Sequence, residues 1–136
     1  MTWTYTQSTG ELAHNGEHVG TGYSGHGDAR NDPRRQTERG TGPIPCGAWA
    51  IEGPPIDTPE HGPFVLHLTP KPGTETFNRS GFLIHGDSVA HPGEASLGCI
   101  IMPRPVRMSV WGSGDRDLVV QATQPASGAA DPGALT

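Results

Sequence analysis

Glycine and proline interrupt this chain so often that little room remains for long regular elements. The sequence holds 20 glycines and 14 prolines among its 136 residues, and both residue types favour turns over element interiors. Hydrophobic residues make up only 32% of the chain, but they cluster in short runs that provide material for one small core. These features predict a mainly β single domain with one or two short helices and long loops.

Apolar runs and turn residues give a coarse order of elements. Short stretches rich in β-branched and aromatic residues predict strands, at 3–7, 11–14, 17–23, 48–51, 64–68, 82–84, 100–102 and 118–122. A short helix is expected from Arg104 to Trp111, ended by Gly112. Loops are expected at 25–41, 53–63 and 69–79. The boundaries predict a domain of residues 1–123 and a flexible C-terminal tail at 124–136.

Charge and hydropathy exclude several classes of partner. The formal net charge is −5 and the isoelectric point is near 5.7, which disfavours a nucleic-acid binder and an anionic membrane surface. No apolar run approaches the roughly 20 residues needed to cross a bilayer, so membrane insertion is not expected. The first residues lack the basic start and apolar run of a signal peptide, so the ordinary export route is not expected either. We expect a monomer.

The strongest chemical signal is a histidine and a cysteine at the ends of two predicted strands. His85 follows the run 82–84, and Cys99 precedes the run 100–102. If the strands pair as a hairpin, the imidazole approaches the thiol and can generate the nucleophilic thiolate. Taken separately, the cysteine is explained as a small buried side chain and the histidine as a structural hydrogen-bonding residue. Together, with small residues beside the sulfur, they favour catalysis.

The small residues around this pair have roles of their own in that hypothesis. Ser96 and Gly98 flank Cys99, and the glycine leaves space for a substrate carbonyl. The N–H groups of Gly98 and Cys99 could form an oxyanion hole. Gly86 leaves the backbone beside His85 open, and a carbonyl accepting from Nδ1–H would leave Nε2 free to face the sulfur.

The segment 81–102 resembles the signature of the L,D-transpeptidase (YkuD-like) family, in which His-Gly or His-Ser precedes a Ser/Thr-x-Gly-Cys block. The subgroup of type VI secretion effectors is more similar, because its blocks resemble this chain in order along roughly Trp3 to Ala122. The further blocks lie at 22–27, 31–33, 42–49, 79–82 and 103–107. Leu97 stands where the broader family often has histidine, and the loop from His85 to Ser96 is shorter than is common there. Both departures fit the effector subgroup better.

The resemblance implies an L,D-transpeptidase-like β-sandwich and acyl transfer on peptidoglycan tetrapeptide stems. Cys99 would attack the carbonyl on the L-centre of meso-diaminopimelate, D-alanine would leave, and a thioester would remain on the sulfur. A second stem amine would then give a cross-link, a free D-amino acid would give exchange, and water would give L,D-carboxypeptidase trimming. Resemblance to the effectors favours exchange and trimming. It also implies an antibacterial toxin without a cofactor, delivered to the periplasm of a target bacterium, with a secretion apparatus and an immunity protein as partners.

Eight further residues are candidates for substrate binding. The resemblance places one block near the substrate, although a turn-rich, solvated loop explains it about equally well; this block contributes Tyr23, Ser24, His26 and Asn31. Arginine offers a bidentate fork for stem-peptide carboxylates, and arginines flank the central segment at 79, 104 and 107, although a surface arginine without a partner is the commoner case. The eighth candidate is Asp87, which would share a face with His85 if the strand continued.

The three candidate arginines are Arg79, Arg104 and Arg107.

A metal site is a further alternative, with His85, Asp87, His91 and Cys99 as its ligands. It ranks well below covalent catalysis, because no paired ligand spacing is present. The second cysteine, Cys46, is expected to pack in a turn. The remaining histidines, His61 among them, have no neighbouring motif that indicates a functional role.

Two rival functions stay open: another peptidoglycan cysteine amidase or endopeptidase, and a non-catalytic wall-binding module with a buried Cys99.

Overall fold

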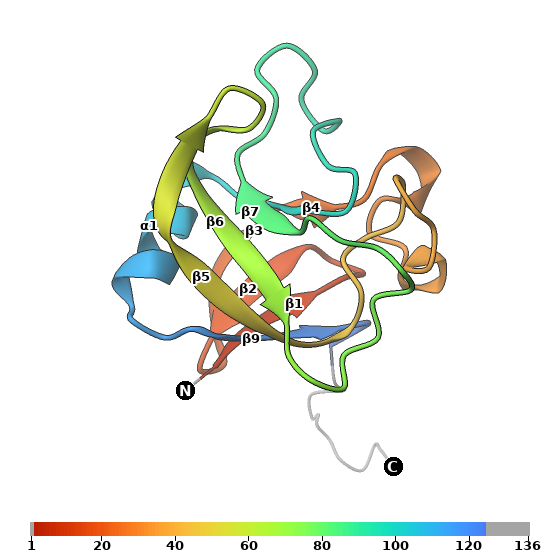
Figure 1. The fold of residues 1–136 in the computed structure, drawn as a ribbon, viewed down its shortest axis with the longest axis horizontal. Coiled ribbons are helices and arrows are strands. Elements are labelled where there is room, and N and C mark those ends of the chain that lie inside the picture. Colours follow the sequence, from red (N-terminus) through yellow and green to blue (C-terminus); the bar gives the residue numbers. More distant parts are fainter. Residues whose placement is uncertain (1, 125–136) are drawn as a thin grey trace.

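A computed structural model describes residues 2–124 of the chain. It contains nine strands, one α-helix and two 3₁₀ turns, and Figure 1 shows how they are arranged. The strands are β1 (Trp3–Thr6), β2 (Glu11–His14), β3 (Glu17–Thr21), β4 (Tyr23–Ser24), β5 (Gly47–Thr58), β6 (Gly62–Pro70), β7 (Leu83–His85), β8 (Ile100–Ile101) and β9 (Asp117–Gln121). Apart from Gln124, the expected tail at 124–136 lies outside the described residues.

The described strands form one hydrogen-bonded sheet in the order β3-β2-β1-β9-β5-β6-β7-β8-β4. Two neighbouring pairs are parallel, β1 with β9 and β7 with β8, and the other pairs are antiparallel. The mainly β class is therefore confirmed. The strands do not form the expected β-sandwich of two separate sheets. Strand β9 pairs with both β1 and β5, so it joins the N-terminal strands to the β5–β6 hairpin in one continuous sheet.

The two ends of this sheet meet at Gly22. β3 and β4 are the first and last strands of the sheet, yet only Gly22 separates them in the chain. The sheet must therefore curl until its edges lie together. Gly22 N–H donates to Gly10 O at 2.8 Å, and a Cβ on Gly22 would lie only 1.7 Å from Ile101 O. Glycine is the residue that fits where these two backbones approach so closely.

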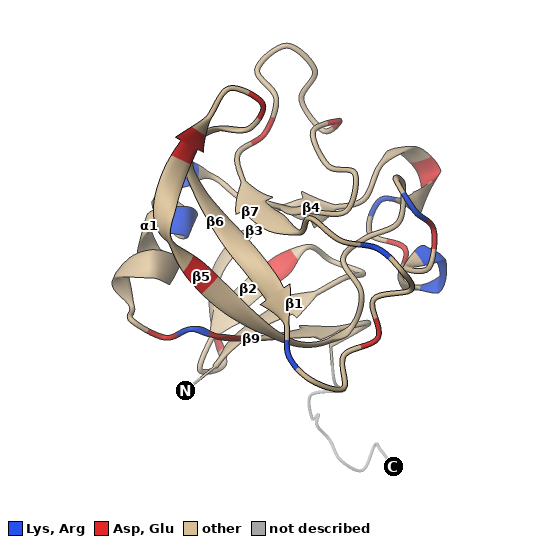
Figure 2. Cartoon of the chain, viewed as in Figure 1, with Lys and Arg blue, Asp and Glu red and all other residues tan. Residues whose placement is uncertain are grey.

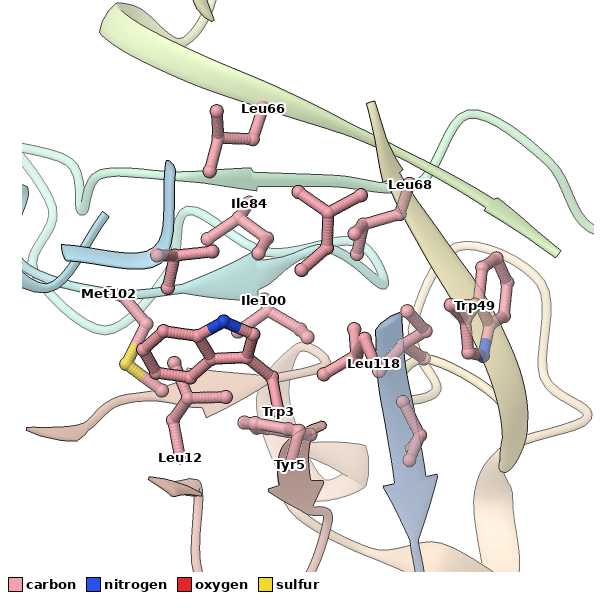
Figure 3. Close-up of a cluster of buried hydrophobic side chains, with 14 of the residues drawn as sticks. Trp3, Tyr5, Leu12, Trp49, Leu66, Leu68, Ile84, Ile100, Met102 and Leu118 are labelled. Carbon is pink, nitrogen blue, oxygen red and sulfur yellow. The ribbon is translucent and has the colours of Figure 1, made fainter. Parts of the chain in front are cut away.

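The concave side of the curled sheet holds the core. Apolar side chains alternate along the strands, so that one face of each strand is buried. Figure 3 shows Trp3, Tyr5 and Leu12 of the N-terminal hairpin meeting Ile100, Met102 and Leu118 from the other strands. Trp49 packs edge-on against Phe82, with ring centroids 5.0 Å apart. The buried set reaches from β1 to β9, so the curled sheet closes on a single core.

The central hairpin is longer than its sequence indicates. The proline-rich segment 53–63, expected as a loop, instead extends the strands, with Ile56 paired to Val65 and Thr58 paired to Gly62. The register shifts on both sides of Ile56, and such irregularities admit prolines that a regular ladder would exclude. The hairpin tip therefore projects from the same end of the molecule as the loop that follows β7 (Figure 1).

One helix, α1 (Arg104–Gly112), crosses near β6 and β7, close to the predicted range of 104–111. Pro105 lies in its first turn, where a missing N–H costs nothing. Val106 and Val110 are buried on its inner face. In the expected loop 25–41, two short 3₁₀ turns occur, η1 (Gly27–Ala29) and η2 (Pro33–Arg35). Within residues 2–124, no helix has the length and apolarity needed to cross a membrane.

The expected hairpin between the His85 and Cys99 strands is wrong. β7 and β8 are parallel, with Ile84 opposite Ile100 and His85 opposite Ile101. The segment 86–99 is long enough for the crossover that parallel strands require. The other edge of β8 pairs antiparallel with β4, so β8 lies between β7 and the strand that closes the sheet.

A single methyl group at Gly22 tests the closure of the sheet. We expect Gly22→Ala to lower the free energy of unfolding by about 3 kcal/mol or more, because the new Cβ overlaps Ile101 O. Gly112→Ala is the matched control, since a Cβ there meets nothing within 4 Å. Urea denaturation of both variants measures the difference. Equal stabilities would show that the sheet ends do not meet as described.

Candidate active site

The parallel pairing of β7 and β8 brings the imidazole and the thiol to one face of the sheet. Side chains opposite each other in a parallel pair point the same way, and every second residue returns to that face. Cys99 precedes β8 and is two residues before Ile101, the partner of His85. Ile84 and Ile100 occupy the opposite face and enter the core. The topology differs from the expected hairpin, but the two reactive groups still share a face.

The imidazole of His85 is oriented by its own neighbour in the chain. Its Nδ1 lies 2.8 Å from Gly86 O, and because a carbonyl accepts only, Nδ1 carries the proton. The other ring nitrogen, Nε2, is buried and has no hydrogen-bond partner. Burial is the main cause that lowers the pKa of His85, and the Gly86 bond opposes it. The site therefore holds a neutral imidazole whose free lone pair is on Nε2.

The thiol of Cys99 is free and half-buried. Burial raises its pKa to about 11, while the backbone N–H of Leu83 and the positive charge of Arg79 oppose this effect. The sulfur lies 3.7 Å from Gly81 O, within reach of a weak S–H donor bond. Since His85 Nε2 has no partner, the thiol and the imidazole are not hydrogen-bonded in this state. A base is therefore required to generate the thiolate.

Two cavities meet at the His85 side chain. The cavity lined by Cys99, here called the thiol cavity, has a volume of about 640 Å³. The second, here called the helix-side cavity, is lined partly by the start of α1 and has a volume of about 1020 Å³. Three residues line both cavities: His61, His85 and Ala95. The side chain of the candidate base thus borders both cavities.

The charges of the two cavities differ. The helix-side cavity is lined by the carboxylates of Glu60, Asp87 and Glu94 and also by two arginines, Arg104 and the buried Arg107. Figure 2 shows acidic residues both on the tip of the β5–β6 hairpin and in the loop after β7. The thiol cavity has arginines but no acidic side chain in its lining, with Arg39 exposed at its edge. An anionic group would therefore be favoured on the Cys99 side of His85.

Ser96 and Gly98 have different places from those expected. The buried Ser96 hydroxyl donates to Cys99 O at 2.6 Å and accepts from Gly25 N–H and Gly98 N–H. The Gly98 N–H is therefore already engaged and is not available to a substrate oxyanion in this state. Of the two N–H groups expected to form an oxyanion hole, the Cys99 N–H remains the candidate donor. Ser96 instead fixes the backbone turn that presents the sulfur.

Arg79 is buried beside the thiol. Its guanidinium donates to Gln36 O, Gly42 O and Pro43 O at 2.5–2.8 Å, and more weakly to Leu97 O at 3.5 Å. A Cβ on Gly98 would lie 2.5 Å from Arg79 Nη2, which explains the glycine at that position. These bonds leave little donor capacity for a substrate carboxylate, so the structure supports a positioning role for Arg79.

Arg107 is a second buried arginine with backbone partners. It extends from α1 to the hairpin tip, where its Nη1 donates to Pro63 O and Phe64 O at 2.5 and 2.9 Å. Its Nε donates to Met102 O. Arg104 is exposed at the start of α1 and lines the helix-side cavity. Of the two helix arginines, Arg104 is therefore the one free to meet a ligand carboxylate.

Tyr23 and Asp87 are joined across the helix-side cavity. The Tyr23 hydroxyl donates to Asp87 Oδ1 at 2.6 Å and accepts from Ala95 N–H. Partial burial opposes ionisation of Asp87, but bonds from Tyr23, Gly93 and Ser88 lower its pKa overall. Burial and this carboxylate raise the pKa of Tyr23 to about 12. The pair ties the loop after β7 to β4.

The other three candidates lie away from the cavity linings. Ser24 is buried and hydrogen-bonds to Gly98 O and Ile44 N–H. Asn31, at φ 59°, closes a turn by accepting from Ser24 N–H, and His26 precedes η1 with a buried, unpartnered Nδ1. Ser24 therefore supports the Cys99 turn from behind, whereas Asn31 supports Ser24 and His26 is not brought to the cysteine.

The sequence interpretation missed His61. This residue stacks on His85, with ring centroids 4.3 Å apart, and lines both cavities. No local pattern marks it, because the contact depends on the full length of the β5–β6 hairpin. Within residues 2–124, no group of three or more His, Cys, Asp or Glu side chains is placed to hold a metal ion.

Fold and site together define a small β domain with a cysteine and a histidine at an open, two-chambered cleft. The Tlde1 domain family matches residues 18–122. The chain therefore belongs to the Tlde1 family, whose members are enzymatic type VI secretion effectors that act on the bacterial cell wall. Such an effector is delivered to a target cell and has a cognate immunity protein. Neither the curated proteins nor the solved structures gave a match.

Removing the Arg79 guanidinium tests its positioning role. We expect Arg79→Met to lower the free energy of unfolding by about 2–4 kcal/mol, because several buried carbonyls lose their donor. Arg39→Met, at an exposed arginine of the same cavity, should change stability by less than about 0.5 kcal/mol. Urea denaturation compares the two. An Arg79→Met protein as stable as the wild type would contradict the positioning role.

Proposed function

We propose that this effector is a cysteine-dependent L,D-transpeptidase or L,D-carboxypeptidase acting on the tetrapeptide stems of peptidoglycan. The observation that carries the proposal is the lone pair of His85 Nε2, buried without a partner at the cavity that Cys99 lines. A neutral base with a fixed tautomer at the same cavity as a protonated thiol is an arrangement suited to nucleophilic catalysis. The family's action on the cell wall supplies the substrate class.

In the first step, the thiol proton passes to His85 Nε2 while the Cys99 sulfur bonds to the carbonyl carbon on the L-centre of meso-diaminopimelate. The carbonyl oxygen becomes an oxyanion. The Cys99 N–H is the proposed backbone donor to this oxyanion. When the intermediate collapses, the bond to D-alanine breaks, and His85 returns its proton to the leaving amine. A thioester remains on Cys99.

The acceptor determines the product. Water gives trimming and restores the thiol, while a free D-amino acid gives exchange of the terminal residue. A second stem amine would give a cross-link. In each case, His85 takes a proton from the attacking group and returns one to the sulfur. We propose exchange and trimming as the main outcomes, with the exposed Arg104 available to a carboxylate in the helix-side cavity.

Muropeptide analysis with three variants tests the proposal. Mass spectrometry of tetrapeptide muropeptides, with and without a free D-amino acid, should show loss or replacement of the terminal D-alanine. Cys99→Ala should abolish this change, and His85→Gln should reduce it by at least about a hundredfold. Cys46→Ala is the matched control, because Cys46 is a free thiol hydrogen-bonded to Gln7 and outside both cavity linings.

The products distinguish the rival functions. Cleavage elsewhere in the stem would identify a different cysteine amidase or endopeptidase. Unchanged muropeptides in every sample, together with a Cys99 that resists alkylation in the folded protein, would favour a non-catalytic wall-binding module. Activity that survives in Cys99→Ala would overturn the proposed nucleophile.

The pH profile tests the proposed base. Burial lowers the pKa of His85 below its ordinary value of about 6.5, and the imidazole accepts a proton only when neutral. We therefore expect kcat/KM to rise with pH through a midpoint below about 6.5 and then to level off. The thiol, whose pKa is about 11, stays protonated over this range. A midpoint clearly above about 7 in the wild-type protein would contradict the assignment.

A further inference from the structure

His61 is a histidine with no part in the acyl transfer just described. It lies at the tip of the β5–β6 hairpin, between Thr58 and Gly62. Its ring is half-buried and stacks on that of His85, with centroids 4.3 Å apart and planes tilted by 37°. It also belongs to the lining of both cavities. His61 therefore stands where the two cavities meet, against the candidate base.

The contact between His61 and His85 matters because His85 Nε2 is buried and has no hydrogen-bond partner. A buried ring nitrogen without a partner loses its hydrogen bond to water and gains none from the protein. Such an atom is uncommon, and it persists only where the surrounding side chains keep water away. His61 is the ring stacked on this imidazole, and it belongs to a different element from both reactive groups. A movement of the hairpin tip would change how much water reaches Nε2.

The hairpin tip is held in place by named contacts. Arg107 donates from α1 to Pro63 O and Phe64 O, and Thr58 Oγ1 accepts from His61 N–H at 2.8 Å. Arg107 also packs against Gly86, where a Cβ would lie 2.9 Å from its Nη2. Gly86 O in turn orients His85. Arg107 therefore contacts both the hairpin tip that carries His61 and the backbone beside His85, and so fixes the distance between the two rings.

We infer that His61 is a positioning residue that caps the imidazole of His85, keeps water from Nε2 and so reserves its lone pair for the thiol proton. The inference rests on the proposed function, because it assumes that His85 is the base. The proposed capping depends on the flat ring of His61 and not on its charge. A phenyl ring should therefore replace it, and a methyl group should not.

The titratable and charged groups around His85 agree with this role. His61 faces it from the hairpin tip, Arg107 from α1 and Asp87 from the loop after its own strand, and Cys99, in the segment before β8, lines the same cavity. Burial is the largest cause that lowers the pKa of His85, ahead of the charges of its neighbours. Removing the capping ring would hydrate the imidazole, so this pKa should rise.

Nuclear magnetic resonance of the imidazole nitrogens measures this directly and needs no substrate. The full chain, labelled with ¹⁵N-histidine, would be titrated as wild type, His61→Ala and His61→Phe, with His85→Gln assigning the His85 signal. We expect the His85 midpoint to move to higher pH in His61→Ala and to stay near the wild-type value in His61→Phe. His67→Ala is the matched control, since His67 is an exposed histidine of the same hairpin.

The outcomes separate the inference from the proposed function. Equal His85 midpoints in all variants would overturn the capping role, and so would a His61→Phe protein that behaves like His61→Ala. Thermal unfolding checks that each variant is folded; if His61→Ala is not, His61→Gln takes its place. On muropeptides, His61→Ala should lower kcat about tenfold and change KM by less than about twofold. Shifted midpoints without muropeptide turnover in the wild type would retain the cap and reject the proposed reaction.

Discussion

The parallel pairing of β7 and β8 is the constraint on which the site depends. Its register places His85 opposite Ile101 and leaves Cys99 two residues earlier on the same face. The same two strands send Ile84 and Ile100 into the core, so a slip of one residue would turn these side chains away from the core and point His85 and Cys99 into it. Core packing therefore holds the register of the site, and the closure at Gly22 holds β8 against β4.

Two buried arginines frame this pair of strands. Arg79 binds the carbonyls of the 36–43 segment beside Cys99, and Arg107 binds those of the hairpin tip beside His85. A buried guanidinium is costly to desolvate unless its donors are satisfied, and in both cases backbone oxygens satisfy them. Loops without regular ladders are thus tied to the site by cations. This explains how a chain so rich in glycine and proline can position reactive side chains.

Local signals in the sequence predict most elements and single out His85 and Cys99, which the structure places on one face of the sheet. Helix α1 was predicted within a residue of its observed end, and the Cys99 and His85 strands were found from apolar runs. The sequence predicts a loop at 53–63 because proline weakens a ladder, yet irregular pairing around Ile56 lets this segment extend the two strands of the hairpin. The parallel topology and the His61 contact could not be predicted, since both depend on which distant segments the curled sheet brings together.

The electrostatics of the site imply that its reactivity depends on the substrate. A thiol whose pKa is about 11 is almost entirely protonated near neutral pH, and a protonated thiol is a weak nucleophile. His85, with its pKa lowered by burial, is a weak base toward such a thiol. On the proposed mechanism, proton transfer therefore becomes favourable when a substrate carbonyl is in place to accept the sulfur, so that proton transfer and attack proceed together. On this mechanism, Cys99 reacts fastest while a stem peptide occupies the thiol cavity.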